Sequence, residues 1–333
     1  MSLLPLTSQD AMTTDLAGLR HPLVRDLAWL LHAPDILTTP IAGRPSLQEL
    51  GLDDPQRRRD WLSAFEHKPR TIEAQVGPSL VKRLGHYHEK LWHFLLEHAP
   101  DTQLLAHNLT VRDSTRRTLG ELDLLYRHEN DRQPVHLELA IKYYLGLPQG
   151  PQAMNSQARW IGPGCADSLA VKRRHSLDHQ LPLSCRPEAA DILASFGAPP
   201  LTHRLALLGV LFRSWPDGAS LASPQEIAPD ALFGDWLPLS RWPDFCAPLY
   251  EKNAIRGAFL DKPHWLAPPV DTDLIELNRL NEMLGQHFVQ RRSPRQLILK
   301  HSESHWQRLF IVPDDWPHRI PLPPFSYAGT NSF

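Results

Sequence analysis

Few cysteines and no long hydrophobic run occur in this sequence. Cys165, Cys185 and Cys246 are the only three cysteines among 333 residues, and they are too scattered for a disulfide framework or a zinc knuckle. No apolar stretch is long enough to span a membrane. The N-terminal apolar run is interrupted by Pro5 and lacks the basic residues of a signal peptide. Together these features predict a cytoplasmic protein with reduced thiols and no membrane partner.

The chain also lacks the strong positive charge of proteins that coat nucleic acid. Its 35 Lys and Arg residues are balanced by 37 Asp and Glu residues, for a net charge of −2. Any contact with DNA or RNA must therefore come from a local basic patch. Walker A, Rossmann, Gly-x-Ser-x-Gly and His-Glu-x-x-His motifs are absent from the sequence. Composition alone does not predict an oligomeric state.

What the chain does contain is enough apolar material, 42% of its residues, to bury a large core. Its 32 prolines indicate long structured loops rather than a helical bundle. We predict four regions: a flexible N-terminal tail at 1–20, a helical region at 21–78, a core at 79–200, and a C-terminal α/β extension packed on that core at 201–333.

Hydrophobic periodicity locates the expected secondary structure. The 3.6-residue period predicts helices at 23–31, 55–65, 79–98 and 271–289. Runs of β-forming residues predict strands at 104–111, 118–127, 135–144, 201–212, 295–300 and 308–312. The short connections between the first three strands favour an antiparallel meander. Asp167 or Ser168 can cap a further helix that runs to about Gln180.

Side-chain alternation along two of these strands brings two acidic residues together. Successive side chains on a strand point to opposite faces. The strand at 135–142 has a wholly apolar face, with the opposite face formed by His136, Glu138, Ala140 and Lys142. The strand at 120–126 has an apolar face of Leu122, Leu124 and Tyr126, opposite Glu121 and Asp123. Pairing the apolar faces places Asp123 and Glu138 on the same side of the sheet.

Converging carboxylates repel each other unless solvent separates them, one is protonated, or a cation lies between them. Mg²⁺ favours one or two carboxylates together with water and phosphate oxygens. A nearby lysine can stabilise charge on a phosphate or orient the attacking water. Asp123 and Glu138, with Lys142 on the same face, therefore indicate a Mg²⁺ or Mn²⁺ site for phosphodiester hydrolysis. The alternative is an ordinary half-solvated sheet face.

These residues also resemble a known superfamily. Gly120-Glu121-Leu122-Asp123, a turn, and then 136–142 (HLELAIK) resemble the core of the PD-(D/E)XK nucleases. This resemblance covers about residues 79–181. It implies a restriction-endonuclease-like α/β core with a mixed central sheet flanked by helices, Mg²⁺ dependence, and cleavage of DNA or RNA. The chain as a whole looks similar to an uncharacterised bacterial family, a domain of unknown function placed in that superfamily.

One position departs from the superfamily motif. The usual lysine follows the second acid by two residues, but Ala140 stands there and Lys142 lies two positions further on. Both positions share a face, and Lys142 would lie roughly 7 Å further along the strand. Either Lys142 is a migrated catalytic lysine, or the site has lost efficient hydrolysis.

Further residues could support such a site. Glu89 lies at the edge of the apolar stripe of the helix at 79–98, and in the superfamily that helix often adds a carboxylate; a plain surface glutamate is the alternative. Lys172 and Arg173, with Gln180, could contact a nucleic-acid backbone from the next helix, and His136 could bond phosphate. A solvated helix face and a buried sheet histidine are the corresponding ordinary interpretations.

The sequence therefore supports three functional hypotheses. The first is a metal-dependent phosphodiesterase that acts on nucleic acid, with Asp123, Glu138, Lys142 and Glu89 as its catalytic residues. The second is a catalytically degenerate relative that binds nucleic acid or protein, favoured by Ala140 and the near-neutral charge. The third is an assembly protein that uses the region at 214–269, rich in tryptophan and proline, as an interface. Whether the chain is an enzyme stays open at this point.

Overall fold

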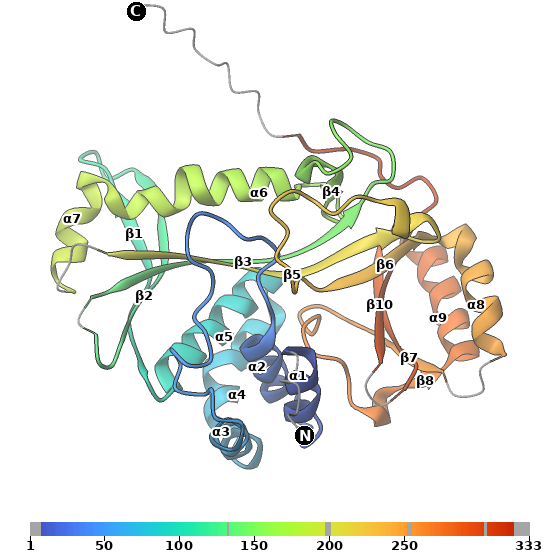
Figure 1. The fold of residues 1–333 in the computed structure, drawn as a ribbon, viewed down its shortest axis with the longest axis horizontal. Coiled ribbons are helices and arrows are strands. Elements are labelled where there is room, and N and C mark those ends of the chain that lie inside the picture. The colour runs from blue at the N-terminus through green and yellow to red at the C-terminus, as the bar shows by residue number, and fades with distance from the viewer. Residues whose placement is uncertain (1–7, 132, 197–200, 252–254, 303–304, 323–333) are drawn as a thin grey trace, which may run out of the picture.

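The computed structural model of the protein describes residues 8–131, 133–196, 201–251, 255–302 and 305–322. Within these residues, one mixed sheet of ten strands crosses the molecule and nine α-helices surround it (Figure 1). The protein is therefore a mixed α/β protein, as the sequence predicts. None of the described helices combines the length and the apolar character that crossing a membrane requires.

The first half of the chain supplies five helices and three long strands. They are α1 (Ser8–Leu16), α2 (Pro22–His32), α3 (Pro55–His67), α4 (Arg70–Val76), α5 (Leu84–His98), β1 (Thr102–Arg112), β2 (Thr118–His128) and β3 (Val135–Gly146). The second half supplies β4 (Trp160–Ile161), α6 (Leu169–His175), α7 (Pro187–Ala194), β5 (Thr202–Ser214), β6 (Phe233–Pro238), α8 (Trp242–Tyr250), β7 (Arg256–Phe259), β8 (Ile275–Glu276), α9 (Leu277–Gln290), β9 (Arg295–Lys300) and β10 (Trp306–Val312).

Strand order follows from the connections. β1, β2 and β3 are joined by tight turns and pair antiparallel, which confirms the predicted meander. β5 returns through α6 and α7 to pair parallel with β3 over eleven residue pairs, from Val135–Thr202 to Leu145–Phe212. The full order is β1-β2-β3-β5-β6-β10-β9-β7-β8, with β4 pairing the end of β3. The sheet thus runs across the domain boundary that we placed at residue 200.

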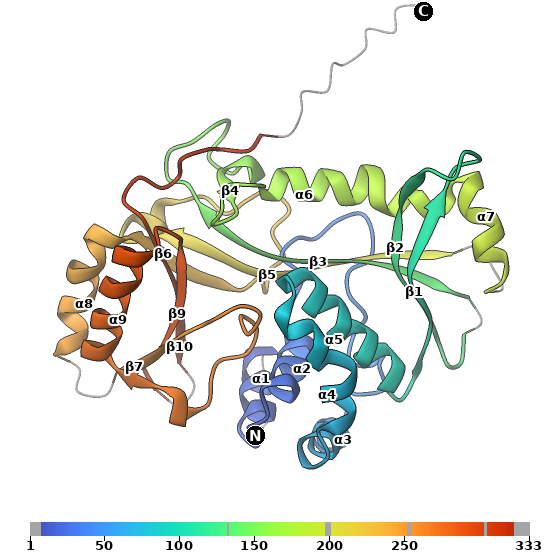
Figure 2. The same cartoon turned by 180° about the vertical axis from the view of Figure 1, so that it is seen from behind.

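Helices cover both faces of the β1–β3 and β5 region. Helices α2 and α5 lie on one face, and α6 and α7 lie on the other (Figure 2). On the first face, Leu124, Leu137 and Leu139 pack with Tyr87 and Leu91 of α5. On the second face, the side of β3 that carries His136 and Glu138 is covered rather than half-solvated. The residues that cover it come after β4 in the chain, among them Lys172 and Ser184. His136 and Glu138 are both 0% exposed.

The C-terminal strands have a helical cover of their own. Helices α8 and α9 pack on β6, β9 and β10 through Phe245, Leu280 and Leu309, all buried. Ile298 and Phe310 point to the opposite side and join the large core that also contains Trp29 of α2. This alternation explains why β9 and β10 are apolar on both faces.

The first half of β5 has no strand on its second side, and the segment between α2 and α3 covers that edge. The Ile36 amide donates to the Leu207 carbonyl at 2.7 Å, and the Asp35 carboxylate accepts from the Leu207 amide at 2.9 Å. Further along, the Leu205 amide donates to the Ala42 carbonyl at 2.9 Å. The covered edge cannot pair with another chain.

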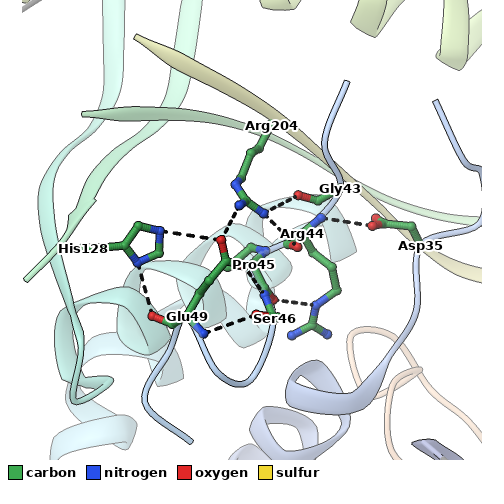
Figure 3. Close-up of polar contacts among 8 residues, drawn as sticks. All are labelled: Asp35, Gly43, Arg44, Pro45, Ser46, Glu49, His128 and Arg204. Carbon is green, nitrogen blue, oxygen red and sulfur yellow. Dashed lines mark hydrogen bonds and ion pairs between the residues drawn. The ribbon is translucent and has the colours of Figure 1, made fainter. Parts of the chain in front are cut away.

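Arg204 of β5 anchors the end of this segment (Figure 3). Its guanidinium donates to the carbonyls of Gly43 and Arg44, each at 3.2 Å, and forms an ion pair with Glu49. Glu49 in turn accepts from the Ser46 amide at 2.7 Å and lies 3.8 Å from His128 of β2. Three parts of the chain that are distant in sequence are therefore joined at one arginine.

Several predicted elements need correction. The predicted tail at 1–20 contains α1, whose Asp15 is buried; residues 1–7 lie outside the described residues. The predicted helix at 79–98 begins only at Leu84, because Lys82 and Arg83 have extended backbone after a 3₁₀ turn at Gly77–Val81. The predicted helix at 271–289 begins at Leu277, since the two residues before it pair with β7 as β8.

Candidate active site at the β2–β3 junction

Asp123 and Glu138 converge where β2 and β3 stop pairing. The last three pairs between these strands end at Leu124 with Leu137, so the next position in register brings Asp123 opposite Glu138. There the Asp123 carboxylate accepts a hydrogen bond from the Leu139 amide at 2.9 Å. Directly opposed residues of antiparallel strands share a face. The structure thus brings together the two acids that the sequence paired.

The expected face of β2 is nevertheless irregular. Leu122 packs with Leu125 and with Leu183 on the side of α7, whereas Leu124 packs with Leu137 on the side of α5. Leu122, Leu124 and Tyr126, which were predicted to lie on one apolar face, therefore do not all lie on the same side of the sheet. Regular alternation breaks at Asp123, the residue between Leu122 and Leu124. This break lets Asp123 interact electrostatically with Glu89 of α5 and with Lys172 of α6.

Burial makes this acid pair electrostatically unusual. Glu138 is 0% exposed, and neither of its carboxylate oxygens has a hydrogen-bond donor among the described residues. Burial and the neighbouring charge of Asp123 raise the pKa of Glu138 well above its usual range. Burial also raises the pKa of Asp123, and the Leu139 amide and Lys172 oppose that rise.

Lys172 is the lysine that approaches the acid pair. Its ammonium lies 3.8 Å from Glu138 Oε1, and its side chain is 13% exposed. It donates to Gln180 Oε1 at 2.8 Å, so Gln180 fixes its position. Burial lowers the pKa of Lys172, and the negative charges of Glu138 and Asp123 counteract this effect. Lys172, for which we considered a phosphate contact or a solvated helix face, lies within the acid cluster.

Lys142 is held away from Asp123 and Glu138 by a different carboxylate. Its ammonium forms an ion pair with Asp167 at 2.5 Å. The Tyr144 hydroxyl donates to the same Asp167 oxygen at 3.3 Å. Within the described residues, Lys142 has no ion pair with either acid of the β2–β3 junction. Its position near Lys172 adds positive charge to the same side of the sheet.

Glu89 lies at the rim of the cluster, on α5. Burial raises its pKa, and the charge of Asp123 adds to that rise. A hydrogen bond from Asn108 of β1 opposes the rise, and His86 lies 3.7 Å from its carboxylate. Glu121, the other acid that we considered, is exposed and adds only a weaker negative field. Glu89 is thus close enough to interact electrostatically with the pair.

The other predicted nucleic-acid contacts are engaged within the protein. His136 is fully buried, its Nδ1 lies 3.1 Å from the Ser184 hydroxyl, and burial lowers its pKa to about 3. This burial contradicts a phosphate-binding role. Arg173 makes two hydrogen bonds to Glu226, at 2.5 and 2.8 Å. Gln180 accepts a hydrogen bond from Lys172. The predicted basic patch on α6 is therefore largely neutralised by internal contacts.

The β2–β3 junction offers a divalent cation two carboxylate ligands, Asp123 and Glu138. Among the residues that the structure describes, no group of three or more His, Cys, Asp or Glu side chains is arranged to hold a metal. Asp123 and Glu138 supply acceptor oxygens, and those of Glu138 accept no hydrogen bond from the described residues. Mg²⁺ and Mn²⁺ accept such a site when water or phosphate oxygens complete their coordination.

The pairing of Glu138 with Lys172 was not predicted from the sequence, although one signal for it was present. Ser168 caps α6 by accepting from the Val171 amide, and Leu169 is fully buried against the sheet. Lys172 follows Leu169 by three residues, so the two side chains lie on the same face of the helix. A helix that starts at Ser168 and buries Leu169 against the sheet is expected to place Lys172 on the side that faces β3. The partnership of Lys142 with Asp167 has no comparable signal.

Residues 25–312 match a family model, described as Domain of unknown function (DUF1853). Comparisons with curated proteins and with solved structures gave no match. The matched range extends from α2 to the end of β10 and contains Glu89, Asp123, Glu138 and Lys172. The resemblance to an uncharacterised family is confirmed at this level. Because the match covers most of the chain, the protein belongs to the family Domain of unknown function (DUF1853).

Proposed function

We propose that the protein is a metal-dependent phosphodiesterase of the PD-(D/E)XK type that acts on nucleic acid. The observation that carries this proposal is the meeting of Asp123, Glu138 and Lys172 at the β2–β3 junction. The order α5, β1, β2, β3, β4, α6, α7, β5 supports the proposal, with β5 parallel to β3. It gives a mixed sheet flanked by helices of the kind that the resemblance implies.

In this proposal Asp123 and Glu138 hold Mg²⁺ or Mn²⁺, which supplies Lewis-acid activation of the phosphate and of a water molecule. Lys172 takes the role that the motif assigns to its lysine. Its ammonium, fixed by Gln180, donates to a phosphate oxygen and offsets the charge that develops there. Glu89 contributes negative charge from the far rim. Lys142, held by Asp167, adds positive charge without contacting the reacting group.

Calorimetry with Mn²⁺, combined with a hydrolysis assay on DNA and on RNA, tests the proposal. We expect binding in the micromolar to millimolar range and Mn²⁺-dependent cleavage of one substrate. Asp123→Asn should abolish both, and Glu121→Gln is the matched control because Glu121 is an exposed acid on the same strand. Cleavage or Mn²⁺ binding that survives in Asp123→Asn would falsify this assignment.

The choice between the two lysines has a separate test. Lys172→Met should lower kcat by about 10²-fold or more, a typical loss for a charge-stabilising group. Lys142→Met should cost less than about 10-fold, because Lys142 acts only from a distance. The reverse order of effects would return the catalytic role to Lys142.

A second candidate function is a binding module that has lost hydrolysis. The complete burial of Glu138 favours it, because a cation must reach a carboxyl that is 0% exposed. Ala140 in the usual lysine position favours it as well. Binding of single- or double-stranded nucleic acid without any Mn²⁺ binding would support this candidate over the enzyme.

A further inference from the structure

A second site, remote in sequence from Asp123 and Glu138, is a cavity between the N-terminal helices and the C-terminal strands. Its volume is about 520 Å³, within the range of small-molecule sites. Residues of α1, α2, β6, β9, β10 and the segment 268–272 line it. Four cationic side chains lie in its wall, those of Arg20, Arg25, Lys300 and Arg308. Asp271 is the acidic residue among its lining residues.

Two of these cations are buried without a carboxylate in direct contact. Arg25 is 8% exposed and donates only to carbonyl oxygens, those of Leu16, Leu19, Pro268 and Pro269. Arg308 is 9% exposed and donates to the carbonyls of Trp265 and Leu266. Neither guanidinium has a carboxylate in ion-pair contact within the described part of the chain. Lys300, in contrast, is paired with Asp271 at 2.8 Å.

Buried charges are normally paired, because an isolated charge loses much of its hydration. Carbonyl oxygens satisfy hydrogen bonds but cancel none of the net charge. Burial accordingly lowers the pKa of Arg25 and of Arg308. Asp26 acts electrostatically on both arginines, and Asp271 and Asp273 act on Arg25, but none of these carboxylates is in ion-pair contact with either guanidinium. The positive charge of the cavity wall is therefore only partly offset, which favours an anion.

Two buried donors in the same wall also lack acceptors. Arg25 Nε and Trp29 Nε1 have no hydrogen-bond partner among the described residues, and Trp29 is 0% exposed. The two residues are one turn apart on α2, so their side chains occupy neighbouring positions on one face of the helix. Buried N–H groups without acceptors are uncommon in folded proteins. Both donors are suited to oxygen atoms of a bound anion.

Aromatic rings complete the wall. Phe233 and Trp306 line the cavity and also line a smaller adjoining hollow that Arg213 and Arg308 share. Lys300 Nζ lies 5.4 Å from the centre of the Trp306 ring. Flat faces beside cationic groups suit a ligand that carries an aromatic ring.

We propose that this cavity binds an aromatic phosphate monoester of the nucleoside monophosphate class. The phosphate, with a charge of about −1.5 to −2 at pH 7, matches the unpaired charges of Arg25 and Arg308. The N–H groups of Arg25 and Trp29 donate to its oxygens, and the base lies against Trp306 and Phe233. The inference is independent of the proposed hydrolysis, because the cavity includes none of the residues of the β2–β3 junction.

Calorimetry on the full chain in EDTA tests this site, with AMP, adenosine and inorganic phosphate as three separate ligands. EDTA removes any cation from the acid pair. We expect AMP to bind with a Kd in the micromolar range, and phosphate and adenosine each to bind at least about 10-fold more weakly, a loss of about 1.4 kcal/mol. Phosphate that binds as tightly as AMP would overturn the aromatic part of the proposal. AMP without detectable binding at 1 mM would overturn the whole.

Variants separate this site from non-specific attraction. Trp29→Phe keeps an aromatic ring and removes the indole N–H, and should weaken the binding of AMP about 5- to 10-fold. Arg25→Met should weaken it by more than about 10-fold. Arg241→Met is the control, since Arg241 is also an arginine beside an aromatic ring, 5.6 Å from that of Trp215, but lies outside the cavity. If Arg25→Met does not fold by circular dichroism, Trp29→Phe decides alone. Equal affinities for AMP in Trp29→Phe and Arg241→Met would refute the site.

Discussion

The Asp123 carboxylate replaces a backbone group in the ladder between β2 and β3: it accepts the Leu139 amide at 2.9 Å, one step beyond the last regular pair. An amide that would be unpaired where the strands separate is thereby satisfied. The same contact holds the Asp123 side chain in a fixed orientation beside Glu138. One hydrogen bond thus lies where the strand pairing ends and positions an acid.

Replacing Glu138 with glutamine should stabilise the protein. The buried carboxyl has two oxygens without donors, and the amide has the same shape without the charge. Because the pKa of Glu138 is raised in the folded state, the wild-type protein loses stability as the pH rises above the usual value of 4.5. We expect Glu138→Gln to gain about 1 kcal/mol in the free energy of unfolding at pH 8, measured with urea.

Glu121→Gln serves as the control for this change, because Glu121 is exposed one strand away. It should alter the free energy of unfolding by less than about 0.5 kcal/mol. A destabilised Glu138→Gln protein at pH 8 would mean that the ionised carboxylate contributes more through Lys172 than its burial costs.

Gly209→Ala should strongly destabilise the sheet. Gly209 has φ +142, and an added Cβ would lie 1.7 Å from the Lys142 carbonyl oxygen on the neighbouring strand. We expect a loss of about 3 kcal/mol or more in the free energy of unfolding. Gly85→Ala is the opposite case, because nothing lies within 4 Å of an added Cβ in α5. It should gain about 0.5–1 kcal/mol. Thermal unfolding of both variants checks the pair.

Adjacent arginines on α3 should differ sharply in importance. Arg58 Nε donates to Asp15 at 2.5 Å, both side chains are buried, and His32 lies 2.7 Å from the same carboxylate oxygen. Arg58→Ala should therefore cost about 3–5 kcal/mol by leaving a buried carboxylate short of a partner. Arg57 is half exposed and 3.8 Å from Asp101. Arg57→Ala should change the unfolding free energy by less than about 1 kcal/mol.

The pH dependence of this ion cluster has a definite sign. Burial alone would raise the pKa of Asp15, but hydrogen bonds from His32 and Arg58 bring it below its usual value of 3.8. Its contribution is therefore fully present above that value and is lost as the pH falls through the lower folded-state pKa. Urea titrations of Arg58→Ala and wild type should converge only under strongly acidic conditions.

Buried histidines should make the protein sensitive to mild acid. Burial lowers the pKa of His88 and of His136 to about 3, against 6.5 in an unfolded chain. Between these values the unfolded chain binds more protons, so stability falls as the pH drops below 6.5. Each histidine should contribute about 1.4 kcal/mol per pH unit. Urea unfolding at pH 7.5, 6.5 and 5.5 measures the slope.

His88→Gln isolates one of these contributions. The Trp92 indole donates to His88 Nε2 at 3.0 Å, and glutamine retains an acceptor for it. The change of the unfolding free energy with pH below 6.5 should therefore become smaller by about 1.4 kcal/mol per pH unit. His67→Gln, at an exposed position on α3, is the matched control for the loss of a histidine. An unaltered slope in His88→Gln would show that His88 is protonated in the fold.

Local patterns were sufficient to predict part of the site. Period-two alternation in β3 put Glu138 on one face, and the short turn before it fixed its neighbour as the strand of Asp123. The cap of α6 was narrowed to Asp167 or Ser168, and the structure shows that it is Ser168. These features depend on residues close in sequence, for which the backbone geometry allows few alternatives.

Tertiary packing determined the rest. The irregular face of β2 at Leu122 depends on where α7 packs, and no pattern within β2 encodes that position. The burial of His136 and Glu138 depends on segments that arrive more than thirty residues later in the chain. The partners of the two lysines, Asp167 for Lys142 and Glu138 for Lys172, likewise depend on how distant segments pack together. Sequence alternation does not carry this information.

The segment that covers the edge of β5 has a consequence for synthesis of the chain. Asp35 and its partner Leu207 are 172 residues apart. At the usual rates of translation, about 5–20 residues per second, Asp35 leaves the ribosome roughly 10–35 s before Leu207 does. During that interval the segment at 35–42 cannot form its contacts with β5. The N-terminal part of this protein is therefore made first but completed late.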